Sequence, residues 1–98
     1  MNYMIRALDG ADMLEKRLEV RQAHLDNLSE VKGKILCAGG LLDEEGKMKG
    51  SSLVIDFDSK EALDDYLASE PYIKAGVWQD VEVHPINVLI VNGEKYVK

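Results

Sequence analysis

The order of strand-like and helix-like segments constrains the fold of this chain more than any other feature. Apolar residues alternate in some stretches and recur at helical spacing in others, so the 98 residues divide into six main segments. In chain order these are a strand over 3–8, a helix over about 12–31, strands over 34–42 and 51–57, a helix starting near 59, and a strand over 79–86. Pro71 follows the second helix and a short helical turn is expected after it, while 87–91 is interpreted as a short extra strand.

This βαββαβ order predicts an α+β fold of the ferredoxin-like type, an antiparallel sheet with two helices on one face. A chain of this length with 46% hydrophobic residues can build one core, so we expect a single domain over 1–98 with a loose tail from about 93. We place Val54, Met4 or Ile5, and Val81 or Trp78 on the uncovered face. An apolar face of that size predicts a homodimer that pairs through the sheet.

Charge and apolar patterning exclude several classes of partner. The formal net charge of −6 argues against binding nucleic acid or an anionic membrane surface, both of which need a basic face. No apolar run approaches the about 20 residues of a membrane span, and charged residues interrupt the first apolar run, so a cytoplasmic location is expected. Cys37 is a lone cysteine in an apolar segment and is predicted to be a small buried hydrophobe.

The first helix has a cation at the centre of an apolar stripe. At about 100° per residue, Arg21 lies on the stripe formed by Leu14, Leu18, Leu25 and Leu28. A buried cation is costly without an anionic partner. Arg21 is therefore expected either to bind the carboxylate of a small molecule or to form a salt bridge with Asp9 or Glu70. Arg17 is expected to be partly exposed and to pair with nearby acids.

Several stretches, taken in order, resemble the YCII-related (YciI-like) family. They are Leu14-Glu15-Lys16-Arg17-Leu18 with Val20-Arg21 and His24-Leu25, then Gly33 to Leu41 with Ala38-Gly39-Gly40, Gly50-Ser51, Glu70-Pro71-Tyr72 with Ala75-Gly76-Val77, and Val81-Glu82-Val83 with Pro85. The resemblance implies a fold of the dimeric α/β-barrel type. It also implies a site centred on His24 and on Glu70, where the family usually has aspartate. Members of the family have been linked to dehydrochlorination or isomerisation of ring-derived acids, so the resemblance implies chemistry of that kind.

The candidate site residues each have a functional and a structural interpretation. His24 could act as general acid or base with Glu70 orienting its ring, or the two could form a structural pair. Ser51 could meet an anion or only satisfy a loop. Tyr72 and Trp78 could line an apolar pocket, or they could be core or dimer contacts.

Cofactor chemistry has no sequence support. His24 and His84 have no third ligand at a recognisable spacing, so no metal is expected. Gly39-Gly40 lacks the lysine and helix of a phosphate loop, and no organic cofactor is expected.

The sequence thus favours an enzyme that moves a proton on a small anionic organic acid or lactone, of isomerase or lyase (dehydrochlorinase) type. The alternative is a non-catalytic homodimer that binds a small ligand or serves a structural role.

Overall fold

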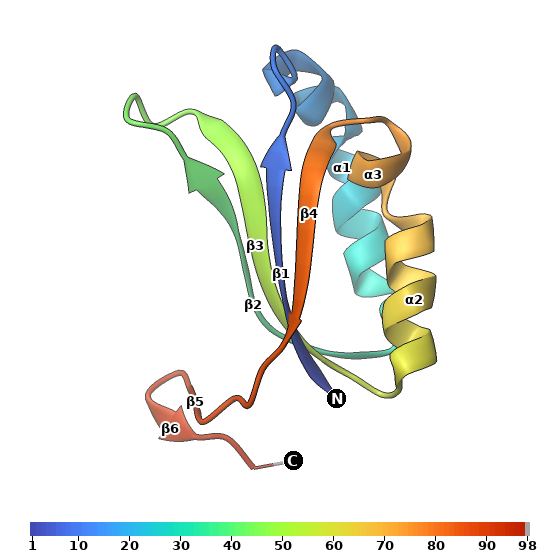
Figure 1. Cartoon of the computed structure of the whole chain (residues 1–98), viewed down its shortest axis with the longest axis vertical. Helices are drawn as coiled ribbons and strands as arrows, with labels where there is room; N and C mark the ends of the chain where they lie inside the picture. The colour runs from blue at the N-terminus through green and yellow to red at the C-terminus, as the bar shows by residue number, and fades with distance from the viewer. Residues whose placement is uncertain (98) are drawn as a thin grey trace.

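The fold is built on one four-stranded antiparallel sheet, and the helices cover one of its faces (Figure 1). A computed structural model describes residues 1–97. The four strands of the sheet, in the spatial order β2-β3-β1-β4, are β1 (Asn2–Asp9), β2 (Gly33–Leu42), β3 (Met48–Phe57) and β4 (Trp78–Pro85). The helices are α1 (Leu14–Ser29), α2 (Lys60–Ser69) and the short α3 (Pro71–Lys74). The predicted ferredoxin-like arrangement is confirmed.

The core lies between the sheet and the helices. Residues of β1 and β3 alternate between the two faces of the sheet. Those on the helix side are buried: Tyr3, Ile5, Ala7, Ser51, Leu53, Ile55 and Phe57. The apolar ones share one cluster with Ala62, Leu63 and Tyr66 of α2, which have the spacing expected of one face of a helix. This face of the sheet also holds the candidate site.

Gly50 lies where a side chain would meet the backbone of β1. A Cβ at this position would clash with the Ala7 carbonyl oxygen, so only glycine fits there. The next residue, Ser51, pairs with Ala7 in the β1–β3 register and is buried on the helix side. The glycine thus helps to place a serine hydroxyl beneath α1.

Helix α1 is rotated about its axis relative to the sequence-based prediction. Its buried residues are Arg17, His24 and Leu28, whereas Leu14, Leu18 and Leu25 are 37%, 62% and 38% exposed. The predicted leucine stripe and the predicted burial of Arg21 are therefore wrong. The polar stripe turns inward because the sheet and α3 present polar partners to it, described below.

The start of α1 also differs from the predicted one. Asp12 does not cap the helix but has a left-handed backbone with φ 58°, and the helix begins at Leu14.

The uncovered face of the sheet is mixed rather than apolar. Val81 and Val83 pair with Ala7 and Ile5, so they share the helix side, and Trp78 is also buried. On the other face Arg6 forms an exposed salt bridge with Glu82 at 2.5 Å. Cys37, expected to be buried, is exposed.

The end of the chain forms a small hairpin on the side of the sheet away from the helices (Figure 1). Its strands are β5 (Ile90–Val91) and β6 (Glu94–Lys95), and the Tyr96 hydroxyl donates to Asp56 Oδ2 of β3 at 2.6 Å. Of the tail expected from about 93, Lys98 lies outside the described residues. An apolar groove of about 720 Å³ separates this segment from the sheet, lined by Leu36, Cys37, Val54 and residues 86–92.

Within residues 1–97, none of the helices has both the length and the apolar character needed to cross a bilayer.

Candidate functional site

A buried histidine–carboxylate pair joins α1 to the segment that leads into α3. His24 Nδ1 lies 2.7 Å from Glu70 Oε1, and the side chains are 10% and 0% exposed. An ionised carboxylate only accepts hydrogen bonds, so with Glu70 in that form Nδ1 donates. The other ring nitrogen, Nε2, then carries the lone pair of the neutral ring. It makes no hydrogen bond to any residue that the structure describes, so it is the nitrogen available to a ligand.

Three donors hold the Glu70 carboxylate in place. Glu70 is the residue before Pro71, and it caps α3 by accepting from the Tyr72 backbone N–H at 3.0 Å. The Tyr66 hydroxyl donates to Glu70 Oε2 at 2.6 Å, and His24 occupies the remaining direction. A carboxylate engaged in this way can orient an imidazole but has little freedom to reach a ligand itself.

Tyr66 is a member of the site that sequence reasoning missed. Burial raises the pKa of the Tyr66 phenol, and the nearby Glu70 charge raises the pKa further. The hydroxyl therefore keeps its proton and stays a donor to Glu70 at any ordinary pH. Its spacing of four residues from Glu70, at the end of the same helix, is the signal that could have revealed it.

Aromatic rings fix the orientation of the His24 side chain. The Tyr72 ring stacks on the imidazole with centroids 4.1 Å apart and an interplanar angle of 18°. Trp78 meets the imidazole edge-on at 5.9 Å. Burial also raises the pKa of Tyr72, with the nearby Arg17 and Arg21 charges acting in the opposite direction.

A second buried cluster ties α1 to β1 and β3. Arg17 donates from Nε to Asp9 Oδ2 at 2.7 Å and from Nη2 to Asp9 Oδ1 at 3.3 Å. Nη2 also donates to Ser51 Oγ at 2.6 Å. The guanidinium lies over the Tyr72 ring, 4.6 Å from its centroid. Arg17 is therefore buried and fully engaged, where the sequence led us to expect a partly exposed residue.

A cavity of about 190 Å³ opens beside these two clusters. The candidate residues that line it are Arg17, Arg21, His24, Ser51 and Tyr72, and the remaining lining residues are Leu25, Leu28, Ala38, Gly39, Gly40, Met48 and Leu53. Trp78 does not line it but packs behind His24 and Tyr72. Asp9 is held behind Arg17 and lines a neighbouring cavity instead.

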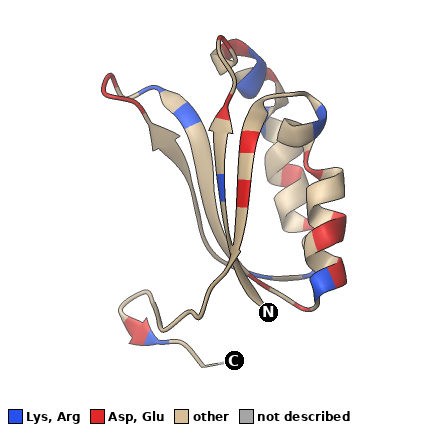
Figure 2. Ribbon diagram, viewed as in Figure 1, with Lys and Arg blue, Asp and Glu red and all other residues tan. Residues whose placement is uncertain are grey.

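Arg21 is the cation of this cavity that remains available. It is exposed and forms no salt bridge with any residue that the structure describes, so of the two alternatives the salt bridge with Asp9 or Glu70 is wrong. The chain has a net charge of −6, and acidic side chains outnumber basic ones on α2 and β4 (Figure 2), so two arginines at one cavity make a local exception.

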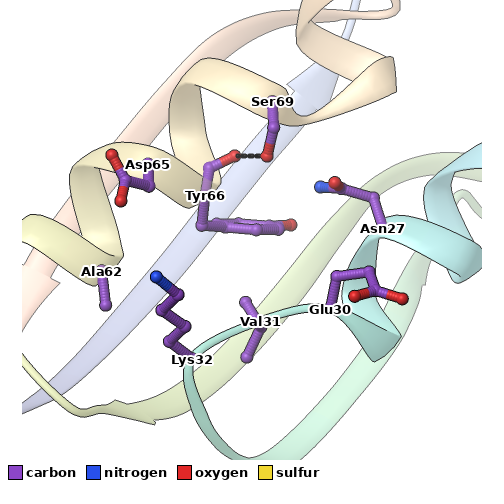
Figure 3. A pocket seen from close by; sticks show the side chains of 8 residues that line it. All are labelled: Asn27, Glu30, Val31, Lys32, Ala62, Asp65, Tyr66 and Ser69. Atoms are coloured by element: carbon purple, nitrogen blue, oxygen red, sulfur yellow. Dashed lines mark hydrogen bonds between the residues drawn. The ribbon is translucent and has the colours of Figure 1, made fainter.

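A smaller cleft of about 100 Å³ lies between α1 and α2 (Figure 3). Tyr66 crosses it, with Asn27 on the side toward which the phenol points. Both signs of charge line it, from Glu30, Lys32 and Asp65. The cleft reaches the histidine–carboxylate pair only through Tyr66.

The remaining histidine is remote from the cavity. His84 is exposed on β4 and lies 3.3 Å from Glu82. Residues 1–97 contain no cluster of three or more potential metal ligands.

Comparison with known proteins identifies the family. The model of the YCII-related domain matches residues 1–87. The chain belongs to the YCII-related family. Among curated members, the protein YciI of Escherichia coli is 39% identical over 93 residues, covering 87% of this chain and 95% of the relative. An uncharacterised member from Haemophilus influenzae is 38% identical over the same coverage.

Solved structures extend the comparison of this YCII-related chain. The 5-chloro-2-hydroxyhydroquinone dehydrochlorinase of Burkholderia phenoliruptrix AC1100, in complex with 2,5-dihydroxybenzoquinone, is 26% identical with a TM-score of 0.78. The match covers 89% of this chain and 94% of the dehydrochlorinase. An antibiotic biosynthesis monooxygenase shares the fold, with 12% identity, coverage of 91% and 98%, and a TM-score of 0.60. These neighbours have the ferredoxin-like fold of the dimeric α/β-barrel class.

Proposed function

We propose that the protein is an enzyme that moves a proton on a small anionic ring compound, such as a hydroxylated quinone or a lactone acid. The observation that carries the proposal is the His24–Glu70 pair, fully oriented by buried donors, with the imidazole at the wall of a cavity. The likeness to a dehydrochlorinase that binds 2,5-dihydroxybenzoquinone supports the class of ligand.

In this proposal Arg21 and Ser51 bind the ligand, and His24 transfers the proton. Arg21 supplies a fork-shaped cation for an oxyanion of the ligand. Ser51 accepts a hydrogen bond from Arg17, so its own hydroxyl proton is free to be donated toward the cavity. Arg17 positions Ser51 and offers positive potential without giving up its salt bridge to Asp9.

In the proposed step His24 Nε2 takes a proton from a saturated ring carbon that is attached to a carbonyl directly or through one C=C bond. The C–H electron pair forms a C=C bond and the carbonyl π electrons move to oxygen, giving an enolate and an imidazolium. Glu70 stabilises the imidazolium through Nδ1. Return of the proton to another carbon completes an isomerisation. In an elimination the enolate re-forms the carbonyl, a C=C bond forms to the adjacent carbon, the leaving group departs from that carbon with its electron pair, and the imidazolium releases its proton to water.

The test follows exchange of ring hydrogen for deuterium by proton NMR, with 2,5-dihydroxybenzoquinone and muconolactone as probes. The ring hydrogens of the quinone lie on unsaturated carbons, so their exchange begins with the reverse step: the imidazolium adds a deuteron to a ring carbon of the enolate, and Nε2 then takes the original hydrogen from that saturated carbon. We expect the protein to accelerate exchange of at least one probe and His24→Gln to lose about 10²-fold or more of that rate. His84→Gln, an exposed histidine outside the cavity, serves as the matched control and keeps the full rate.

Two results would contradict the proposal. If both probes bind, as measured by calorimetry, but neither exchanges, the site is a non-catalytic ligand-binding site. If neither probe binds and His24→Gln lowers the melting temperature by more than about 10 °C, the pair is structural.

A further inference from the structure

The side chain of Met48 forms one wall of the cavity that contains His24, and it fills the space that Gly40 of the neighbouring strand leaves empty. Met48 is the first residue of β3, and its thioether occupies the space above Gly40 of β2. A Cβ at position 40 would contact both Sδ and Cε of Met48. The wall at this point is therefore the end of a flexible side chain and not backbone.

Met48 also separates two cavities. It lines the cavity of about 190 Å³ that contains His24, and it lines a neighbouring cavity of about 260 Å³. The second cavity lies toward the start of α1, between Asp9, Leu14 and Lys49. Met48 is the single residue that lines both cavities among those the structure describes.

We propose that Met48 sets the size limit of the ligand, so that the cavity takes one ring and excludes two fused rings. This inference rests on the proposed function, because it concerns the same cavity. Methionine has three rotatable side-chain bonds and Met48 is 38% exposed, so little packing opposes its displacement or truncation. Shortening the side chain joins the two cavities.

The lining of the second cavity defines what could extend into it. Three carboxylates line it, those of Asp9, Asp12 and Asp43, against the two ammonium groups of Lys47 and Lys49, and Asp9 is already paired with Arg17. This lining does not favour an added anionic group. Met13 and Leu14 add apolar surface. A neutral fused ring fits this environment better than a second carboxylate.

The experiment compares the affinities of dihydroxybenzoquinone, with one ring, and hydroxynaphthoquinone, with two fused rings, by isothermal titration calorimetry. We expect the native protein to favour the one-ring compound by about tenfold or more. We expect Met48→Ala to bind the two-ring compound about tenfold more tightly than the native protein does, while its affinity for the one-ring compound changes by less than about threefold.

Two further variants serve as controls. Met48→Leu restores a bulky side chain and keeps the native preference. Leu42→Ala alters an exposed apolar residue that pairs with Met48 in the β2–β3 register but lines neither cavity, and it also keeps the native preference.

The outcomes separate the two proposals. If native protein and Met48→Ala bind the one-ring compound equally and the preference does not change, the size limit is wrong while the proposed function stands. The size limit is also wrong if the native protein binds both compounds equally. If no variant binds either compound, the ligand class proposed for the site is wrong, and the size limit is wrong with it.

Discussion

At the scale of single residues, the two arginines of α1 have exchanged the roles that their sequence positions suggested. Arg17 was expected to be partly exposed and is buried against Asp9 and Ser51, whereas Arg21 was expected to be buried and is exposed. Apolar spacing alone favoured the wrong face because it ignores partners. A buried guanidinium is tolerated where a carboxylate, a hydroxyl and an aromatic face meet it.

Removal of Arg17 tests this assignment at the same scale. Arg17→Met leaves the Asp9 carboxylate buried without its cation and is expected to lower the free energy of unfolding by about 3–5 kcal/mol. Arg6→Met removes the arginine of an exposed pair with Glu82 and is expected to cost about 0–1 kcal/mol. Urea denaturation of both variants measures the difference, and equal costs would show that the buried pair is unimportant.

At the scale of elements, the alternation along β3 and the helical spacing of α2 allowed their inward faces to be predicted correctly. Leu53, Ile55 and Phe57 are buried as the alternation required. The rotation of α1 could not be predicted, because it depends on Ser51 and Glu70, which lie far away in the chain. The His24–Glu70 contact was predictable only through the family resemblance. The role of Tyr66 in the site was predicted neither from the apolar spacing nor from that resemblance.

Tyr66 of α2 donates to Glu70, which caps α3 and contacts His24 of α1. Because this tyrosine titrates, the free energy of unfolding is expected to depend on pH in the alkaline range. The Tyr66 pKa is raised in the folded protein, whereas tyrosine in an unfolded chain titrates near pH 10. Above that pH the unfolded state binds fewer protons than the folded state, so stability falls as pH rises, by up to about 1.4 kcal/mol per pH unit for this one group. Below that pH the contribution is fully present.

Tyr66→Phe removes this titration. The variant is expected to be less stable than the native protein at pH 8 by about 1.5–3 kcal/mol, because a hydrogen bond to a charged group is lost. Its further loss of stability between about pH 10 and 12 is expected to be smaller than that of the native protein. Urea denaturation across this range checks both statements, and parallel pH curves for the two proteins would contradict them.

At the scale of the whole molecule, the surface of interest is the face of the sheet that the helices leave uncovered, through which a second copy of the chain was predicted to bind. The predicted apolar face proved to be mixed, with the Arg6–Glu82 salt bridge on it. The apolar part of this face lies beside the C-terminal segment, where Leu89 and Ile90 are 66% and 69% exposed at the groove against Val54. We therefore expect a second copy of the chain to pair through this region, consistent with the barrel class of the fold.

Sedimentation equilibrium at micromolar concentration tests the pairing. We expect a mass twice the 11.0 kDa of the chain, and a monomer for the double variant Leu89→Asp, Ile90→Asp. Leu18→Asp, a change of an equally exposed leucine on α1, is the control and remains a dimer. A native monomer, or dissociation caused equally by the control, would contradict the expected interface.

The central claim is that Glu70 holds His24 with its proton on Nδ1 and its lone pair, on Nε2, facing the cavity. Nitrogen-15 NMR of the imidazole measures this directly. The neutral ring is expected to be the Nδ1–H tautomer, Glu70→Gln to lose that preference, and dihydroxybenzoquinone to shift the Nε2 resonance while His84 stays unchanged. A neutral ring with its proton on Nε2, or an Nε2 resonance that does not respond to a ligand shown to bind, would contradict the account.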